Sequence, residues 1–170
     1  MDDDQTLTPS ARAAADRADR HFSTSSAREA SHRGELGTWV AEFLASPGSD
    51  NALLAERLAG GDPVWFGPVR LPISELNRLA GPAGEPVLEV VEEDEWRDDV
   101  EDMKEKIDDG WEPAPMIVSY RDDQLVLEDG NHRTESLRQA GEEAVWSVVR
   151  FDTEEERDRF LAAHQDLPTA

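Results

Sequence analysis

The chain has 170 residues, 38% of them hydrophobic, and a formal net charge of −22 at pH 7. This length is enough for one domain with a sizeable core plus an additional segment. The chain contains no cysteine, which excludes disulfides, thiolate metal sites and cysteine nucleophiles. It has no apolar run of membrane-spanning length and no signal-peptide pattern, so we expect a soluble cytoplasmic protein without a membrane partner.

The strong negative charge argues against direct DNA binding, because affinity for DNA comes largely from Lys and Arg side chains on phosphates. The only lysines are Lys104 and Lys106, and arginine supplies the remaining basic charge. Two interpretations of this acidic, lysine-poor composition stay open. One is adaptation to high salt, and the other is a coding bias combined with a few acidic helices.

The first 61 residues divide into two segments. Residues 1–34 contain few large apolar residues, and we expect a mobile arm with at most one helix. Residues 35–61 predict two helices, because apolar residues such as Leu36, Val40 and Phe43 recur at helical spacing. This helical extension must bury its apolar face on the domain that follows, or else on a second subunit in a homodimer.

Residues 62–170 alternate between strand and helix patterns. The expected elements are a strand over 64–73, a helical turn over 74–79, a helix over 92–109, strands over 116–120 and 125–127 joined by a tight hairpin, a helix from 131, a strand over 145–151 and a helix from 154. Pro68 and Pro72 place the first strand at a sheet edge. The helix over 92–109 is densely acidic, which is more typical of a solvated face than of a metal cluster. This order predicts a compact α+β domain with a small mixed sheet and flanking helices.

One segment carries residues suited to chemistry, namely Glu128-Asp129-Gly130-Asn131-His132-Arg133-Thr134. It follows a short apolar strand, turns at Gly130 and continues as a helix. The start of a helix has unpaired amides and the positive end of the helix dipole, so it suits a phosphate group. Arg133 could add a bidentate grip on that phosphate, and His132 a proton donor or acceptor.

Two carboxylates, Glu128 and Asp129, adjoin this helix start and could bind a metal ion or act as a base. Strand alternation sends their side chains to opposite sides, which favours Asp129 as the metal or hydrogen-bonding group. The alternative is an ordinary strand–turn–helix unit with a solvated histidine and arginine.

The five residues from Asp129 to Arg133, with Leu137 and Gly141 behind them, resemble the signature of the ParB/sulfiredoxin superfamily. Partition proteins of this superfamily carry Gly-Glu-Arg-Arg and bind CTP, sulfiredoxins carry Gly-Cys-His-Arg and bind ATP, and free-serine kinases carry Asp-Gly-His-His-Arg. The present box is most similar to the last two. The resemblance covers about residues 62–164 and includes the segments Val69–Leu76 and Gly110–Val118.

The resemblance implies a nucleotide-binding protein that uses ATP or ADP, or else CTP, together with Mg²⁺. It implies that the nucleotide contacts are Gly130, Asn131, His132, Arg133 and Thr134, with Asp129 as metal ligand and with Asp129, His132 and Glu128 as candidate catalytic groups. The expected activity is phosphotransfer to a small-molecule acceptor or ATP hydrolysis. Sulfinic acid reduction is excluded, because Asn131 stands where sulfiredoxins have their cysteine. The alternative is a ParB-like module that binds nucleotide or partners, as a CTP-type switch or a DNA-associated accessory protein, without catalysis.

Overall fold

A computed structural model of the chain describes residues 22–47, 51–78, 101–102, 105–106 and 113–169. Its strands are β1 (Val64–Pro72), β2 (Leu76–Arg78), β3 (Met116–Arg121), β4 (Gln124–Asp129) and β5 (Ala144–Phe151). Its α-helices are α2 (Thr24–His32), α3 (Leu36–Ala45), α4 (Ala52–Ala59), α6 (Asn131–Gln139) and α7 (Glu154–Ala163). A short 3-10 turn, η1 (Ile73–Glu75), joins β1 to β2.

The strands form one mixed sheet in the order β1-β5-β3-β4-β2. Strands β1 and β5 pair antiparallel, as do β3 and β4, whereas β5 with β3 and β4 with β2 are parallel pairs. The first strand, β1, lies at an edge as its two prolines predict, and its register shifts between Phe66 and Val69. The predicted β3–β4 hairpin is also confirmed, and its turn residues Asp122 and Asp123 have φ values of 50° and 63°.

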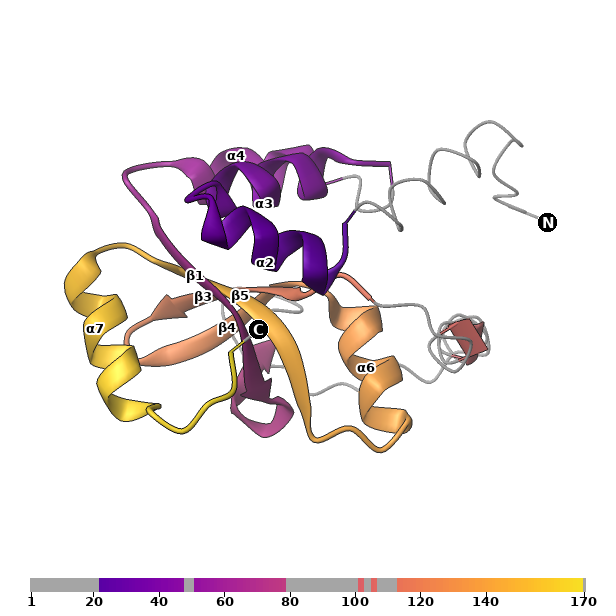
Figure 1. Cartoon of the computed structure of the whole chain (residues 1–170). Helices are drawn as coiled ribbons and strands as arrows, with labels where there is room; N and C mark the ends of the chain where they lie inside the picture. Colours follow the sequence, from indigo (N-terminus) through magenta and orange to yellow (C-terminus); the bar gives the residue numbers. More distant parts are fainter. Residues whose placement is uncertain (1–21, 48–50, 79–100, 103–104, 107–112, 170) are drawn as a thin grey trace.

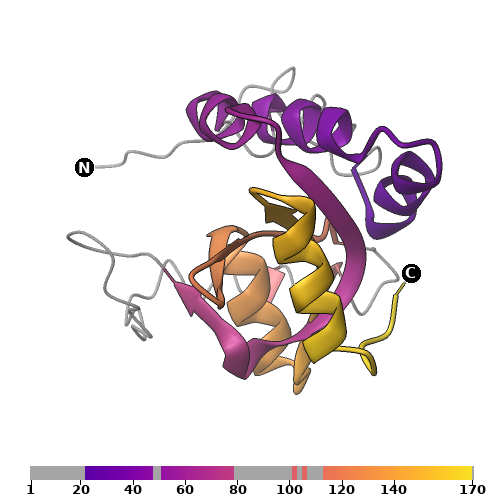
Figure 2. The same cartoon turned by 90° about the vertical axis from the view of Figure 1, so that its left-hand side faces the viewer.

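The sheet is the middle of three layers (Figures 1 and 2). One face is covered by α2, α3 and α4, and from here on the name helical extension includes α2 together with the two helices of residues 35–61. Helices α6 and α7 pack on the other face. The side chains of β3 and β5 are therefore buried on both faces, as expected for central strands. The result is an α+β fold with a small mixed sheet, flanking helices and a preceding helical extension, as the sequence predicts.

The predicted mobile arm over residues 1–34 is wrong from residue 22 onward. Residues 24–32 form α2, and Phe22, Ala27 and Ala30 are buried in the core of the extension. A capping box between Ser23 and residue 26 begins the helix. The sequence gives little sign that this helix is buried, because the residues of α2 that face the core include small alanines, which produce little hydrophobic periodicity. Residues 1–21 lie outside the described part of the chain.

Two further expectations are refined. The helical turn expected over residues 74–79 is the shorter η1, followed by strand β2, which pairs in parallel with β4. The acidic helix expected over residues 92–109 falls mostly outside the described residues, although 101–102 and 105–106 are helical. Every helix in the described part of the chain is too short or too polar to cross a bilayer.

Candidate functional site

The segment that follows β4 forms the strand–turn–helix unit that the sequence predicts. Gly130 has φ of 113° and is the N-cap of α6, and no side chain caps that end of the helix. A Cβ atom on Gly130 would lie 2.5 Å from Met116 Sδ and 3.0 Å from Arg133 Nη2. Both the positive φ and the lack of space therefore require glycine here. The backbone N–H of Thr134 donates to Gly130 O at 2.8 Å and closes the first helical turn.

The Arg133 side chain folds back beneath the helical extension instead of extending into solvent. Its Nη2 donates to Pro115 O at 3.2 Å and to Asp129 Oδ2 at 3.3 Å. Its guanidinium carbon lies 5.3 Å from the centre of the Phe43 ring of α3, which is a cation–π arrangement. Only 16% of the Arg133 side chain and 19% of the Asp129 side chain are exposed. The guanidinium thus links α6, β3, β4 and α3.

Two polar atoms of this helix start are buried without a hydrogen-bond partner among the described residues. They are Nε of Arg133 and Oγ1 of Thr134. A buried, unsatisfied donor costs about 1–3 kcal/mol and more when it belongs to a charged group, so each such atom calls for an explanation. Both atoms lie within one turn of an uncapped helix N-terminus, where an oxyanion could accept from them.

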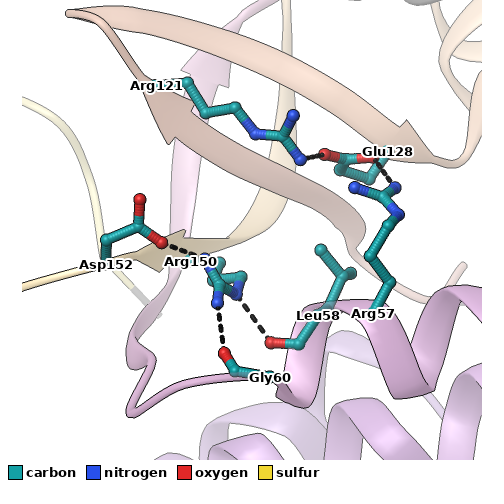
Figure 3. A network of polar contacts seen from close by, with 7 residues as sticks. All are labelled: Arg57, Leu58, Gly60, Arg121, Glu128, Arg150 and Asp152. Atoms are coloured by element: carbon teal, nitrogen blue, oxygen red, sulfur yellow. Dashed lines mark hydrogen bonds and ion pairs between the residues drawn. The ribbon is translucent and has the colours of Figure 1, made fainter.

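The Glu128 carboxylate lies between two arginines and pairs with both (Figure 3). Its carboxylate accepts from Arg57 of α4 at 2.6 Å and from Arg121 of β3 at 2.7 Å. The Glu128 side chain is only 2% exposed, whereas the two arginines are 51% and 44% exposed. The buried carboxylate therefore ties the helical extension to the sheet, and both its oxygens are occupied.

A second arginine contact strengthens this tie at the end of α4. Arg150 of β5 donates from Nε to Leu58 O at 2.6 Å and from Nη2 to Gly60 O at 2.8 Å (Figure 3). These carbonyls belong to the last turn of the helix and have no partner within it. Asp152 accepts from Nη1 of Arg150. The guanidinium caps α4 and fixes its C-terminal end on β5.

The structure brings some of the predicted site residues together and separates others. Asp129, Gly130, Arg133 and Thr134 meet at the start of α6, while the Glu128 carboxylate is held separately by Arg57 and Arg121. Asn131 is half-buried at the first position of the helix. His132 belongs to α6, but its side chain lies outside what the structure describes, so the geometry assigns it no role.

Sequence analysis missed the partners that surround the box. Phe43, Pro115 and Arg57 are distant in the chain from the residues that they contact. A helical pattern marks Phe43 as a core residue, but nothing in a linear sequence indicates that its ring covers an arginine 90 positions later. Only an alignment of co-varying positions could have signalled such a pair.

The neighbouring cavity is small. It measures about 170 Å³ and lies beside α6 and the first residues of β5, with Met116, Leu137 and Trp146 in its lining. Ligand pockets usually measure about 300–1,000 Å³, so this cavity does not hold a whole nucleotide. Among the described residues, His, Asp and Glu side chains form no group of three that could hold a metal ion.

Comparisons with known proteins do not assign the chain to a family. No family model matches the chain, and no curated protein matches it in sequence. Among solved structures, a sulfiredoxin from Arabidopsis thaliana is similar with a TM-score of 0.40 and 19% sequence identity. The similarity covers 58% of this chain and 97% of that chain. At this level of similarity no activity is transferred from that protein.

Proposed function

We propose that the protein binds the phosphate groups of a nucleotide, ATP or ADP in the first instance, at the N-terminus of α6. The observation that carries the proposal is the buried Nε of Arg133, which has no partner among the described residues and lies in the first turn of an uncapped helix. The helix dipole and the guanidinium both favour an anion at this point. The resemblance of the box to nucleotide-binding boxes supports a nucleotide over a free oxyanion.

Binding requires that Arg133 exchange partners. In the structure its Nη2 is occupied by Asp129 Oδ2 and Pro115 O. The 3.3 Å contact with Asp129 is long for an ion pair between charged groups, so a phosphate oxygen could replace it at small cost. The exchange would release the Asp129 carboxylate beside the bound phosphate. Arg133 would then hold the anion, and Gly130 would let the backbone approach it closely.

The residues present fit a Mg²⁺–nucleotide complex and do not fit an all-protein metal site. Mg²⁺ is usually held by one or two carboxylates together with phosphate oxygens and water. Asp129, once released from Arg133, is the carboxylate that could take this role. When bound, the ion would neutralise charge on the phosphate oxygens.

The same contacts bear on whether the protein is an enzyme. A phosphotransferase needs a group beside the phosphate that orients the attacking nucleophile. Glu128 is occupied by Arg57 and Arg121, so Asp129 is the carboxylate that remains for this role. Both carboxylates are paired with arginines in the structure, and this favours the second candidate, a nucleotide-binding module without turnover.

The binding test compares two arginines of α6. We expect Arg133→Gln to weaken ADP binding, measured by titration calorimetry, by about 1.5–3 kcal/mol, the scale of hydrogen bonds to charged groups. Arg138→Gln is the matched control, because Arg138 lies on the same helix, is half exposed and pairs with Glu135. Circular dichroism confirms that each variant is folded. Equal affinities for both variants would show that the phosphate assignment is wrong.

The turnover test uses Asp129→Asn with ATP and ADP, each with and without Mg²⁺. If the protein is a phosphotransferase, the parent releases or transfers phosphate slowly and the variant loses this while binding nucleotide at least as tightly. The retained binding follows from the removal of a competitor for Arg133. Nucleotide binding without turnover in the parent, across a panel of hydroxyl acceptors, selects the module instead.

A further inference from the structure

The helical extension has an apolar core that is mostly its own. The buried residues of this core are Phe22, Ala27, Ala30, Leu36, Trp39, Val40, Phe43, Leu44, Leu54 and Leu58 from the extension, with only Ala114, Ile117 and Val148 from the rest of the chain. The rings of Phe22, Trp39 and Phe43 pack on one another with ring centres 5.3–5.7 Å apart, and the Trp39–Phe43 pair is stacked. The extension therefore keeps most of its packing contacts if it leaves the sheet as a unit.

Beyond this small apolar patch, the extension contacts β1, where Trp65 packs against the extension core and lies close to Gly37 of α3, and it makes polar contacts with the sheet. Arg57 reaches Glu128, Arg150 holds Leu58 O and Gly60 O, and Thr24 Oγ1 donates to Pro113 O at 3.2 Å. Arg57 is half exposed, and ion pairs of exposed arginines are individually weak in water, whereas Arg150 is only 13% exposed. Together these contacts fix the docked position of the extension without making it permanent.

The connection from the extension to the sheet contains a suitable hinge. Gly60 and Gly61 lie between the end of α4 and the start of β1 at Val64. Gly61 has φ of 75°, and a Cβ built there would have no atom within 4 Å. Gly61 thus has open space around it and a backbone conformation that favours glycine, which suits a hinge position.

The docked extension covers the arginine of the candidate site. The Phe43 ring lies over the Arg133 guanidinium, which is 16% exposed and has its Nη2 donors turned to Pro115 O and Asp129. In this arrangement the Nε of Arg133 is buried, and the Phe43 ring of α3 lies over the same guanidinium. Arg57 of the extension also forms an ion pair with Glu128, the residue directly before Asp129.

From these contacts we infer that the helical extension is an autoinhibitory cover, which must leave the sheet before a phosphate anion can bind Arg133. The inference rests on the proposed function and adds a regulation of the same site. Cover and anion compete for one guanidinium, so each weakens the binding of the other. The apparent affinity for the anion is the intrinsic affinity reduced by the fraction of molecules whose cover is open.

The test releases the cover in the full-length chain. Arg57→Glu places a negative charge opposite Glu128 and breaks the tie between α4 and β4. Arg33→Glu is the matched control, because it also reverses an arginine opposite a glutamate, but its partner Glu35 lies within the extension. Each variant lowers the formal net charge of −22 by the same two units, so the long-range repulsion of an anion is equal. Arg57→Gln serves if the reversal prevents folding.

The probe is inorganic pyrophosphate, measured by titration calorimetry. Release of the cover should tighten pyrophosphate binding by about tenfold relative to Arg33→Glu, as a larger open fraction requires. Arg133→Gln in the Arg57→Glu background should remove the gain. A different result would overturn the cover and leave the proposed function standing. In that result the parent, Arg57→Glu and Arg33→Glu bind pyrophosphate with equal affinity, and Arg133→Gln abolishes this binding. Absence of binding in all of them, the released variant included, would overturn both.

Hydrogen exchange in the parent protein gives an independent readout that needs no released variant. A ligand normally slows amide exchange near its site. Saturating pyrophosphate should instead speed exchange in α3 and at Ile117 and Val148, which the extension buries, while exchange in α7 stays constant. Slower or unchanged exchange in α3 on binding would overturn the cover.

Discussion

The two faces of the sheet are covered in different ways. On one face, the centre of the Phe160 ring from α7 lies within 5.6 Å of the centres of the Tyr120 and Phe151 rings, and both of these residues belong to the sheet. On the other face, the aromatic rings of the extension pack mainly on one another, and the sheet contributes Ile117, Val148 and the partly buried Trp65. Helix α7 is thus part of the core of the sheet, whereas the extension is a unit docked on it.

The two faces are therefore held by different kinds of interaction. The face covered by α7 is held by buried apolar area, which is insensitive to single charges. On the other face, the extension is held in position by the arginines Arg57 and Arg150 (Figure 3) and by the cation–π contact of Arg133 with Phe43. Changes of charge should therefore act on the extension, and changes of volume should act on the whole fold.

The largest expected effect comes from removal of the Phe160 ring. Phe160→Ala should lower the free energy of unfolding by about 3–5 kcal/mol, because the side chain is 1% exposed and its loss leaves a cavity. Urea denaturation measures this, and hydrogen exchange should accelerate on both faces together. A loss below about 1 kcal/mol would mean that α7 is no more integral to the core than the extension.

An intermediate effect is expected from loss of the buried charge at Glu128. Glu128→Gln should cost about 1.5 kcal/mol, the lower end for hydrogen bonds to charged groups, because both partner arginines are half exposed and screened by water. We expect Glu128→Gln to speed hydrogen exchange in α4 more than in α7, because the substitution weakens the contact between the extension and the sheet. Glu35→Gln, in a fully exposed ion pair, is the control and should change stability little. Equal effects of the two substitutions would contradict the tie between extension and sheet.

The smallest expected effect is a pH dependence confined to the α7 face. Burial, together with the hydrogen bond that Tyr120 donates to Asp123 Oδ1, raises the pKa of Tyr120 above its usual value of 10.0. The folded state therefore holds this proton more tightly than the unfolded state. Its contribution to stability is complete below pH 10 and is lost as the pH rises through the raised pKa.

Tyr120→Phe isolates this contribution. Denaturation between pH 8 and pH 11 should show a decline above about pH 10 in the parent that is shallower in the variant. The difference between parent and variant, and not the decline itself, is the measure, because other groups titrate in the same range. Parallel curves would mean that the Tyr120 hydroxyl is equally solvated in both states.

Local patterns predicted the elements of the sheet well because their signals are local. Alternating apolar residues and prolines place β1 at an edge, the Asp122-Asp123 turn joins β3 to β4, and Thr153 begins α7 by accepting from Glu156 N–H at 3.2 Å. The carboxylate of Glu156 reaches Asp152 N–H rather than the cap residue itself. Such features depend on residues within a few positions of one another, so they can be inferred from one sequence.

The candidate site was predictable only in part, for the same reason. The turn at Gly130 and the helix that follows are local. A register shift sets Asp129 opposite Ile117 and Leu127 opposite Val118, and it interrupts the strand alternation expected for Glu128 and Asp129. The environment of Arg133 is not local, because Phe43 and Pro115 reach it through the tertiary fold. Nucleotide, metal and turnover stay predictions that the binding and turnover tests address.

The sequence by itself determined the α+β class, the order of β1, β3, β4 and β5 with the helices α3, α4, α6 and α7, and the position of a glycine-initiated helix beside two carboxylates. Each of these follows from periodicity, turn chemistry or chain adjacency over a few residues. Only the tertiary structure decided that α2 belongs to the core, that Glu128 is occupied by Arg57 and Arg121, and that α3 covers Arg133. These contacts join residues up to 90 positions apart, and their pairing depends on how the three layers pack together in space.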